Sequence, residues 1–282
     1  MTGDRRTLSS VANAARLLKQ FTSNERELGV TELARRLGLA KSTVHRLLTT
    51  LEQERLIERD PDTARYRLGL AVFELGAAAS SPTDLHQAVL LPMSVLRVRT
   101  GETVQMAVLD GREVVYIERL ESPNTLRLFL QVGQRNHAHC TGTGKCLLAF
   151  LDERELEAIL DGWQLPAKTA ATIIDLDELR RELRRIRSQG YAVNAHESEP
   201  GVVSVAGPIR DRTGRVVAAI SVAGPAPRMD PRMADLTRLV LEAAATASKR
   251  LTWSYAFDGP GAGRPSARGS SMRNSADPAA TG

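Results

Sequence analysis

The spacing of apolar residues near the N-terminus predicts three short helices. The first is expected where apolar residues recur every three or four positions, at Leu8, Val11, Ala15, Leu18 and Phe21. Thr31 is placed to cap a second helix, and Gly38 provides the break that a tight turn between two helices needs. The third helix is expected to bury one apolar stripe, made of Val44, Leu47, Leu48 and Leu51. Two helices joined by such a turn indicate a helix-turn-helix.

The opposite side of the third helix is polar. It carries Ser42, His45, Arg46 and Thr49 at positions i, i+3, i+4 and i+7. Hydrogen-bond donors and a cation without an apolar residue are what a helix in the DNA major groove requires. An ordinary amphipathic helical hairpin with a solvated outer face is the alternative interpretation.

A basic β-hairpin is predicted directly behind this helix, which favours DNA binding. Residues 56–59 and 65–68 have the pattern of two short strands, and the Asp-Pro-Asp-Thr segment at 60–63 is typical of a turn. Residues 1–68 are therefore predicted to form a winged helix-turn-helix domain that binds DNA. The residues expected to contact DNA are Thr31, Lys41, Ser42, Thr43, His45, Arg46, Thr49, Arg65 and Arg67. Of these, Ser42 and Arg46 are placed for base edges, and Lys41, Arg65 and Arg67 for phosphates.

The pattern changes after the wing to a linker and then to mixed helices and strands. Residues 69–82 are predicted to hold a short, largely apolar helix that ends before Pro82, and it is expected to pack against a partner subunit or on its own domain. Helices are predicted near 84–99, 143–150, 152–161, 175–188 and 231–254. Strands are predicted at 103–109, 112–119, 126–131, 191–196, 202–210 and 215–223. This order favours an α+β domain with an antiparallel sheet over residues 83–257. Residues 258–282, rich in Gly, Pro, Ser and Ala, are expected to be a disordered tail.

Composition limits the class of protein. The chain has 282 residues, long enough for two domains, and its 42% apolar content includes no run long enough for a membrane span. The N-terminus lacks the apolar stretch of a signal peptide, and two closely spaced cysteines do not form a secreted disulfide framework. We therefore expect a cytoplasmic protein without a membrane partner. The net charge of +5 suits a polyanionic partner only weakly, so the placement of cations on the helix and wing carries more weight.

Several residue types in the second half are candidates for chemistry. Zinc or a similar ion could be bound by His137, His139, Cys140, Cys146 and His196, although their spacing matches no structural zinc pattern. The alternative is that the cysteines pack as small apolar residues and the histidines line a pocket or meet solvent. No metal or other cofactor is therefore assigned.

Two further motifs do not support an enzyme. The Gly142–Lys145 segment lacks the first glycine and the Ser or Thr of a phosphate-binding loop, so its glycines are expected to bring a helix N-terminus beside a small, anionic ligand. Glu197 and Glu199 could bind a cation or transfer protons, but no nucleophile, His-Asp pair or metal pattern accompanies them. A solvated or capping loop beside a pocket is the preferred interpretation, and no catalytic residue is assigned.

At this point the chain resembles a known family. The order of winged helix, linker helix and α/β domain is similar to the IclR family of bacterial transcription regulators over about residues 8–255. The block TELARRLGLAKSTVHRLL is close to the family pattern, and HCTGTGKCLLAF at 139–150 and GYAVNAHESEPGVVSVAGPIRDRTGRVVAAISVAGP at 190–225 are more specific. The resemblance implies a GAF-like sensor domain that binds a small, usually anionic or aromatic metabolite. It also implies a homodimer, often paired into a tetramer, that represses or activates transcription.

The resemblance also nominates an effector pocket. By position its residues are Gly142, Thr143, Asn194, Val202, Ser204, Ser221 and Ala223. Asn194 stands where the family usually has Asp, Ser204 where Cys is common, and Ala223 where Ser is frequent; His137 falls where Pro is common. A pocket that has lost a carboxylate should accept an anion with less repulsion.

The resulting hypothesis is a ligand-responsive, non-enzymatic transcription regulator that binds a double-stranded DNA operator and controls a metabolic operon. The alternative is a metal-responsive regulator that uses the His/Cys set described above.

Overall fold

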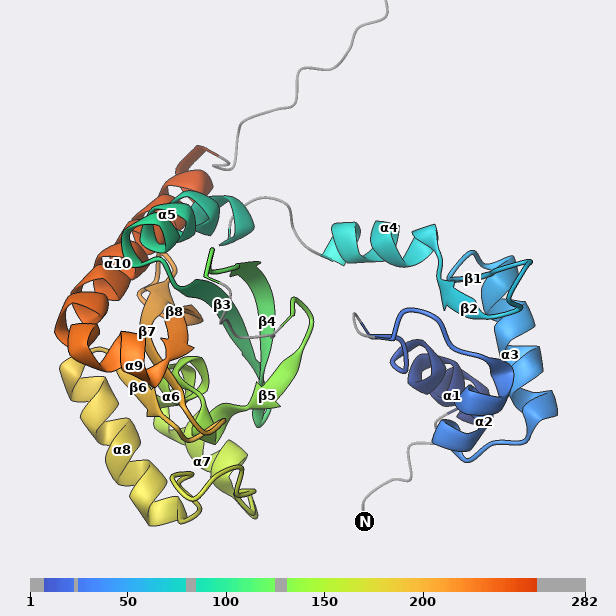
Figure 1. Ribbon diagram of the computed structural model, residues 1–282, viewed down its shortest axis with the longest axis horizontal. Helices are drawn as coiled ribbons and strands as arrows, with labels where there is room; N and C mark the ends of the chain where they lie inside the picture. Colours follow the sequence, from blue (N-terminus) through green and yellow to red (C-terminus); the bar gives the residue numbers. More distant parts are fainter. Residues whose placement is uncertain (1–7, 23–24, 80–84, 125–130, 258–282) are drawn as a thin grey trace, which may run out of the picture.

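The N-terminal part folds around three helices and a two-stranded hairpin. The computed structural model describes residues 8–22, 25–79, 85–124 and 131–257 (Figure 1). The elements of the N-terminal part are α1 (Ser9–Leu18), α2 (Val30–Leu37), α3 (Lys41–Gln53), β1 (Ile57–Arg59) and β2 (Tyr66–Leu68). Antiparallel pairing of β1 with β2 confirms the predicted wing. Leu17, Leu33, Val44, Leu48 and Ile57 form the centre of a separate apolar core.

Two details of this part differ from the sequence prediction. α2 begins at Val30 with Gly29 as its N-cap residue and no side-chain cap, so the prediction that Thr31 caps it was wrong. A residue inside the first turn already has helical backbone angles, and its side chain is not placed to accept from the amides ahead of it. In α1, Leu8 and Val11 are exposed, and the helix buries Leu17 instead. Gly38 has a φ of +67°, the left-handed conformation expected of a glycine that ends α2.

The linker helix α4 (Leu70–Ala79) is apolar and solvent-exposed. Its exposed fractions are 53% at Leu70, 73% at Phe73 and 61% at Leu75. Burial of side chains of this size is energetically favourable, so the exposed apolar surface of α4 is suited to contact with a partner.

The C-terminal part is built on a six-stranded antiparallel sheet, as predicted. Its strands are β3 (Thr103–Asp110), β4 (Glu113–Leu120), β5 (Arg135–His137), β6 (Ala192–Ala195), β7 (Val202–Arg210) and β8 (Val216–Pro225), in the spatial order β5-β4-β3-β8-β7-β6. The predicted strand at 126–131 lies almost entirely outside the described residues, as does the predicted tail at 258–282. The short strand β5 was not predicted.

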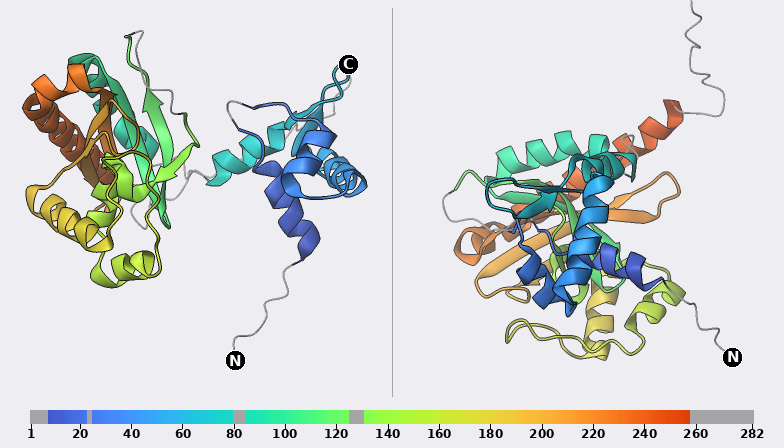
Figure 2. Two further views of the ribbon diagram at one scale, coloured as in Figure 1. Left: turned by 60° about the horizontal axis from the view of Figure 1, so that its bottom comes forward. Right: turned by 90° about the vertical axis from the view of Figure 1, so that its right-hand side faces the viewer.

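Helices cover both faces of the sheet (Figures 1 and 2). One face packs against α5 (Leu85–Thr100) and α10 (Met233–Phe257), which follows the short helices α9 (Ala226–Met229) and η2 (Asp230–Arg232). The other face packs against α6 (Gly142–Ala149), which follows the short η1 (Ala138–Cys140), and then against α7 (Glu153–Leu160) and α8 (Leu176–Gln189). Side chains alternate along a strand, so neighbouring residues of β3 face opposite sides of the sheet. Met106 packs on the α5 side and Ala107 on the α6 side, and the strand has a bulge between these two residues. No helix among the described residues is long and apolar enough to cross a membrane.

Candidate DNA interface and effector site

The predicted recognition helix α3 presents its polar side to solvent. Burial of Val44 and Leu48, four residues apart, fixes the rotation of the helix against its core. This rotation exposes Lys41, Ser42, Thr43, His45, Arg46 and Thr49. Thr31, at the start of α2, is also exposed. Within the described part of the chain the side chains of Lys41 and Arg46 make no hydrogen bond or ion pair, so both cations are available to another molecule.

The two predicted arginines of the wing already have partners inside the protein. Arg67 lies opposite Glu58 in the hairpin, with 2.9 Å between Nη2 and Glu58 Oε2. Arg65 Nη2 donates a 2.7 Å hydrogen bond to the carbonyl oxygen of Glu27. Sequence reasoning missed Arg59, an exposed residue of β1 whose guanidinium lies 5.9 Å from the Tyr66 ring centre. The wing therefore carries three cations, one of them shared with a carboxylate.

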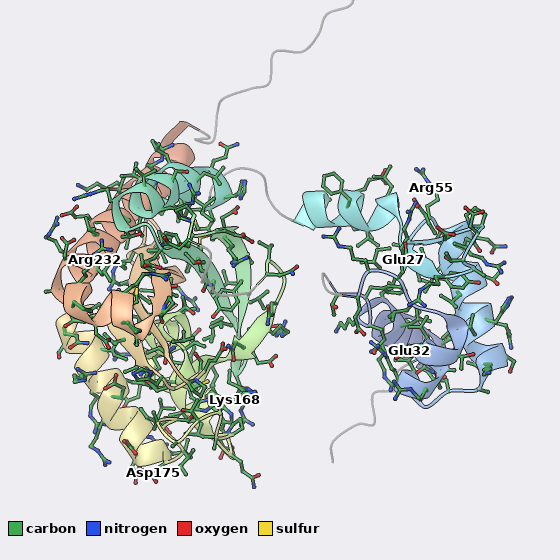
Figure 3. All side chains as sticks on the ribbon, in the orientation of Figure 1. Glu27, Glu32, Arg55, Lys168, Asp175 and Arg232 are labelled. Carbon is green, nitrogen blue, oxygen red and sulfur yellow. The ribbon has the colours of Figure 1, made fainter. Side chains whose placement is uncertain are left out.

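A neighbouring groove on this part is lined by glutamates and arginines in equal number. It has a volume of about 520 Å³ and is lined by Glu25, Arg26, Glu27, Leu28, Glu32, Arg36 and Arg65. Arg36 joins Glu25 and Glu32 through contacts of 2.7 Å, and Glu27 and Glu32 are labelled in Figure 3. Hydrogen bonds from Arg36 lower the pKa of both Glu25 and Glu32. Three glutamates are thus balanced by three arginines along the groove, and one of these, Arg65, is among the residues predicted to contact DNA.

The predicted effector residues on α6 and β7 come together. A Cβ atom added to Gly142 would lie 2.8 Å from Ser204 Oγ, so the first turn of α6 passes directly over β7. Thr141 caps the helix, since its Oγ1 accepts a 3.1 Å hydrogen bond from Gly144 N. This leaves the amides of Gly142 and Thr143 at a helix N-terminus, which favours anions.

The remaining predicted residues lie on the same face of the sheet. Cross-strand pairing places Ser204 between Asn194 and Ala223, and it places Ser221 beside Ala206 of the α6-side core. Val202 shares this face, two residues before Ser204. The two serine side chains are 7% and 2% exposed, and within the described residues neither hydroxyl makes a hydrogen bond. Buried hydroxyls normally have a partner, so both are available to a ligand.

Asn194 uses its side chain inside the protein. Its Oδ1 accepts a 2.8 Å hydrogen bond from Glu197 N, and its Nδ2 donates to Ser198 Oγ at 2.9 Å. The amide therefore holds the β6–β7 loop, in which His196 has a φ of +63°. Its side chain is therefore less available to a further molecule than the two serine hydroxyls are.

Sequence reasoning missed a buried ion pair beside this site. The Lys145 side chain is 2% exposed, and its Nζ lies 2.5 Å from Glu197 Oε1 and 3.5 Å from Glu182 Oε1. Burial raises the pKa of Glu197, although Lys145 acts in the opposite direction. The carboxylate that was considered for cation binding is thus neutralised internally. A lysine within the apolar run of α6 was the only signal of this pair in the sequence.

The His/Cys set is not brought together as a metal site. Among the described residues no group of three or more His, Cys, Asp and Glu side chains is placed to bind a metal ion. Burial lowers the pKa of His139 to about 4 and raises that of Cys140 to about 11 and that of Cys146 to about 12. His139 Nε2 lies 3.1 Å from the carbonyl oxygen of Pro166, and His196 Nδ1 accepts from Gly201 N. The thiols behave as packed apolar groups, which was the alternative interpretation.

A winged helix with an exposed polar recognition face, followed by a sensor-like sheet domain, defines a DNA-binding transcription regulator. The family models of the IclR helix-turn-helix domain and of the bacterial transcriptional regulator IclR C-terminal domain match residues 10–61 and 77–249. The chain belongs to the IclR family of bacterial transcription regulators, a non-enzymatic family.

Named relatives and solved structures agree with this assignment. The chain is 37% identical to the HTH-type transcriptional regulator XynR of Escherichia coli over 223 residues, 79% of this chain and 88% of XynR. It is 34% identical to KdgR of the same organism, over 87% of this chain and 93% of KdgR. A crystal structure of an IclR homolog from Microbacterium hydrocarbonoxydans, complexed with 4-hydroxybenzoate, has a TM-score of 0.78 at 28% identity and covers 86% of this chain and 98% of that one.

Proposed function

We propose that this protein regulates a metabolic operon by binding operator DNA through α3 and the β1–β2 wing, in response to a small, anionic or aromatic metabolite. The observation that carries the effector site is a pair of buried residues, Ser204 and Ser221, whose hydroxyls lack a hydrogen-bond partner among the described residues; Ser204 lies beneath the N-terminus of α6. The 4-hydroxybenzoate complex of the Microbacterium homolog supports an effector of this kind. Gly142, Thr143, Val202 and Ala223 would line the same site, with Asn194 at its edge.

The proposed mechanism needs two subunits. A dimeric DNA reader places its recognition helices about 34 Å apart, or a multiple of that distance. The exposed apolar side chains of α4 are suited to join two copies of the chain, as a homodimer that can pair into a tetramer in the cytoplasm. A ligand changes operator affinity only if it binds the two arrangements of the DNA-binding domains unequally.

The test is operator binding with and without effector. DNA from beside the gene supplies the operator, and 4-hydroxybenzoate is the first probe. Ser204→Ala and Ser221→Ala should leave the operator affinity of the free protein intact and weaken the effector response more than tenfold, because each loses a hydrogen bond to a polar ligand group worth about 1.5–3 kcal/mol. Ser188→Ala, at an exposed position on α8, is the matched control. A wild-type response in both variants would remove these serines from the site, and absence of specific DNA binding by the wild type would overturn the proposed function.

A further inference from the structure

The recognition helix α3 ends in a tight reversal at Arg55, which is labelled in Figure 3. This residue has a φ of +57°, the left-handed conformation in which a glycine usually ends a helix. Arg55 N donates a 2.9 Å hydrogen bond to the carbonyl oxygen of Glu52. Leu56 N donates to the carbonyl oxygen of Leu51, also at 2.9 Å. The reversal is therefore closed by backbone hydrogen bonds to the last turn of α3.

The linker helix α4 begins on this reversal. Ala71 N, in the first turn of α4, donates to the carbonyl oxygen of Arg55 at 3.3 Å. Gly69 N, one residue before α4, donates to the carbonyl oxygen of Leu56 at 2.9 Å. The first amides of a helix have no partner inside it, so these bonds satisfy donors that α4 cannot satisfy itself. The end of α3 and the start of α4 are thus joined through backbone atoms, without a side chain that could change its rotamer.

Gly69 is the point of closest approach in this connection. A Cβ atom added there would overlap with the carbonyl oxygen of Arg55 and would lie 3.2 Å from Ile57 N. Both neighbours are backbone atoms, so neither can move aside as a flexible side chain would. Gly69 is buried and does not have a positive φ, so close packing rather than an unusual conformation requires glycine here. We call Arg55, Leu56, Gly69 and Ala71 the α3–α4 junction.

The two joined helices have different tasks. α3 carries the exposed polar face predicted to read DNA, and α4 carries the exposed apolar side chains of Leu70, Phe73 and Leu75. When two copies of the chain meet through α4, the angle at the junction decides how far apart the two α3 helices stand. Two-fold symmetry repeats any change of that angle in the partner, so its effect on the separation is doubled. One base pair adds only about 3.4 Å and about a tenth of a helical turn, so a small change moves α3 out of register with the major groove.

We propose that the α3–α4 junction sets the spacing between the two operator half-sites that the dimer reads, and that Gly69 is the residue that fixes this spacing. Gly69 is a positioning residue, because it determines the length of DNA that fits between the recognition helices rather than the identity of a base. This inference rests on the proposed function, namely DNA binding by α3 and association through α4. It adds the element of the chain that determines operator geometry.

The test measures binding of the full-length protein to operators of altered length. The wild type first selects its binding sequence from random-sequence duplex DNA, and the centre of that sequence is then shortened or lengthened by one or two base pairs. The wild type should bind each altered operator about tenfold more weakly or worse. Gly69→Ala should lose a similar factor on the selected operator, and its preference for that spacing should shift or disappear. A duplex with a single half-site should bind both proteins equally, because the polar face of α3 is unchanged.

Two further variants separate spacing from folding. Gly29→Ala changes a glycine of the same domain that has a φ of −90° and open space around its Cβ position, and it should behave like the wild type. Insertion of two glycines after Leu68 separates α4 from α3 without placing an atom against Arg55. Because such a linker is flexible, the insertion variant should keep single-half-site binding and accept all the altered operators to a similar degree. Circular dichroism and melting temperature verify that each variant is folded.

Each outcome bears on one claim. Full affinity and an unchanged spacing preference in Gly69→Ala, or the wild-type preference in the insertion variant, would overturn the inference. If Gly69→Ala does not fold, the insertion variant decides alone. A wild type that binds its selected sequence without a spacing preference would overturn the inference and leave the proposed function standing. A wild type that binds no DNA sequence specifically would overturn the proposed function itself.

Discussion

Lys145 Nζ lies 2.5 Å from Glu197 Oε1 in the interior of the C-terminal domain, and both side chains are at most 8% exposed. The contact joins α6 to the loop between β6 and β7. Glu182 Oε1, on α8, lies 3.5 Å from the same Nζ atom, so α8 is joined to them as well. Three elements beside the proposed effector site are thus held by one buried ammonium group.

Removal of one partner of this pair should strongly destabilise the protein. Lys145→Met leaves Glu197 buried without its cation, whereas Glu182 keeps its ion pair with Arg185, and the free energy of unfolding should fall by about 3–5 kcal/mol. The double variant Lys145→Met/Glu197→Leu should recover much of this loss, because it leaves a neutral interior. Urea denaturation of the wild type, both single variants and the double variant measures the coupling. Additive losses would show that the two side chains act independently.

His139 should make the stability of the protein depend on pH between about 6.5 and 4. Its folded pKa is lowered to about 4 from an ordinary 6.5, so the unfolded chain binds the proton more readily over this interval. The free energy of unfolding should therefore decrease by about 3 kcal/mol as the pH falls through it. His139→Phe, which keeps a ring beside Trp163, should flatten the profile, whereas His45→Phe at an exposed position should not. Urea titrations followed by tryptophan fluorescence provide the measurement, and parallel profiles for wild type and His139→Phe would contradict it.

On the recognition helix, Arg46→Ala should cost about 1–3 kcal/mol of operator affinity and relax the base preference at one position per half-site. Arg67→Ala should instead weaken binding to all sequences and flatten its salt dependence, as expected for a phosphate contact. Its effect should be modest because Arg67 already shares its charge with Glu58. Fluorescence anisotropy on operator and scrambled duplexes at several salt concentrations distinguishes the two. Arg181→Ala, exposed on α8, is the control, and unchanged affinity and preference in Arg46→Ala would mean that α3 does not read the DNA.

The exposed apolar surface of α4 predicts that Phe73→Asp weakens self-association. Phe73 is 73% exposed in one chain, and a carboxylate at this position would have to be buried between two copies. Sedimentation analysis should show dissociation at concentrations where the wild type remains associated, with a parallel loss of operator affinity. Ile174→Asp replaces a 61% exposed residue in the loop before α8 and should change neither property. An unaltered sedimentation profile for Phe73→Asp would exclude α4 from the interface.

Local patterns predicted the fold well. The apolar stripe of α3, the Gly38 turn and the strands β3, β4, β7 and β8 follow from spacing within a few residues, and the structure confirms them. The prediction that Thr31 caps α2 was wrong, because the helix begins at Val30 and Thr31 already lies in its first turn. It missed β5, whose three polar residues carry no alternating pattern.

The site was harder to predict than the fold. Gly142, Ser204 and Ser221 were found through the family resemblance, and their assignment to the effector remains a prediction. Lys145 was missed because its significance depends on a partner distant in sequence, namely Glu197. A single sequence does not reveal which buried polar group lacks a partner.

The pairing of β3 with β8 is the seam at which two halves of the described sheet meet, since β3–β5 come from residues 103–137 and β6–β8 from 192–225. Gln105 on β3 and Ser221 on β8 stand on opposite sides of that seam. A molecule bound to both residues would connect chain segments that are far apart in sequence. Its binding energy would oppose local separation of the two halves, and amide hydrogen exchange should slow most along β3 and β8.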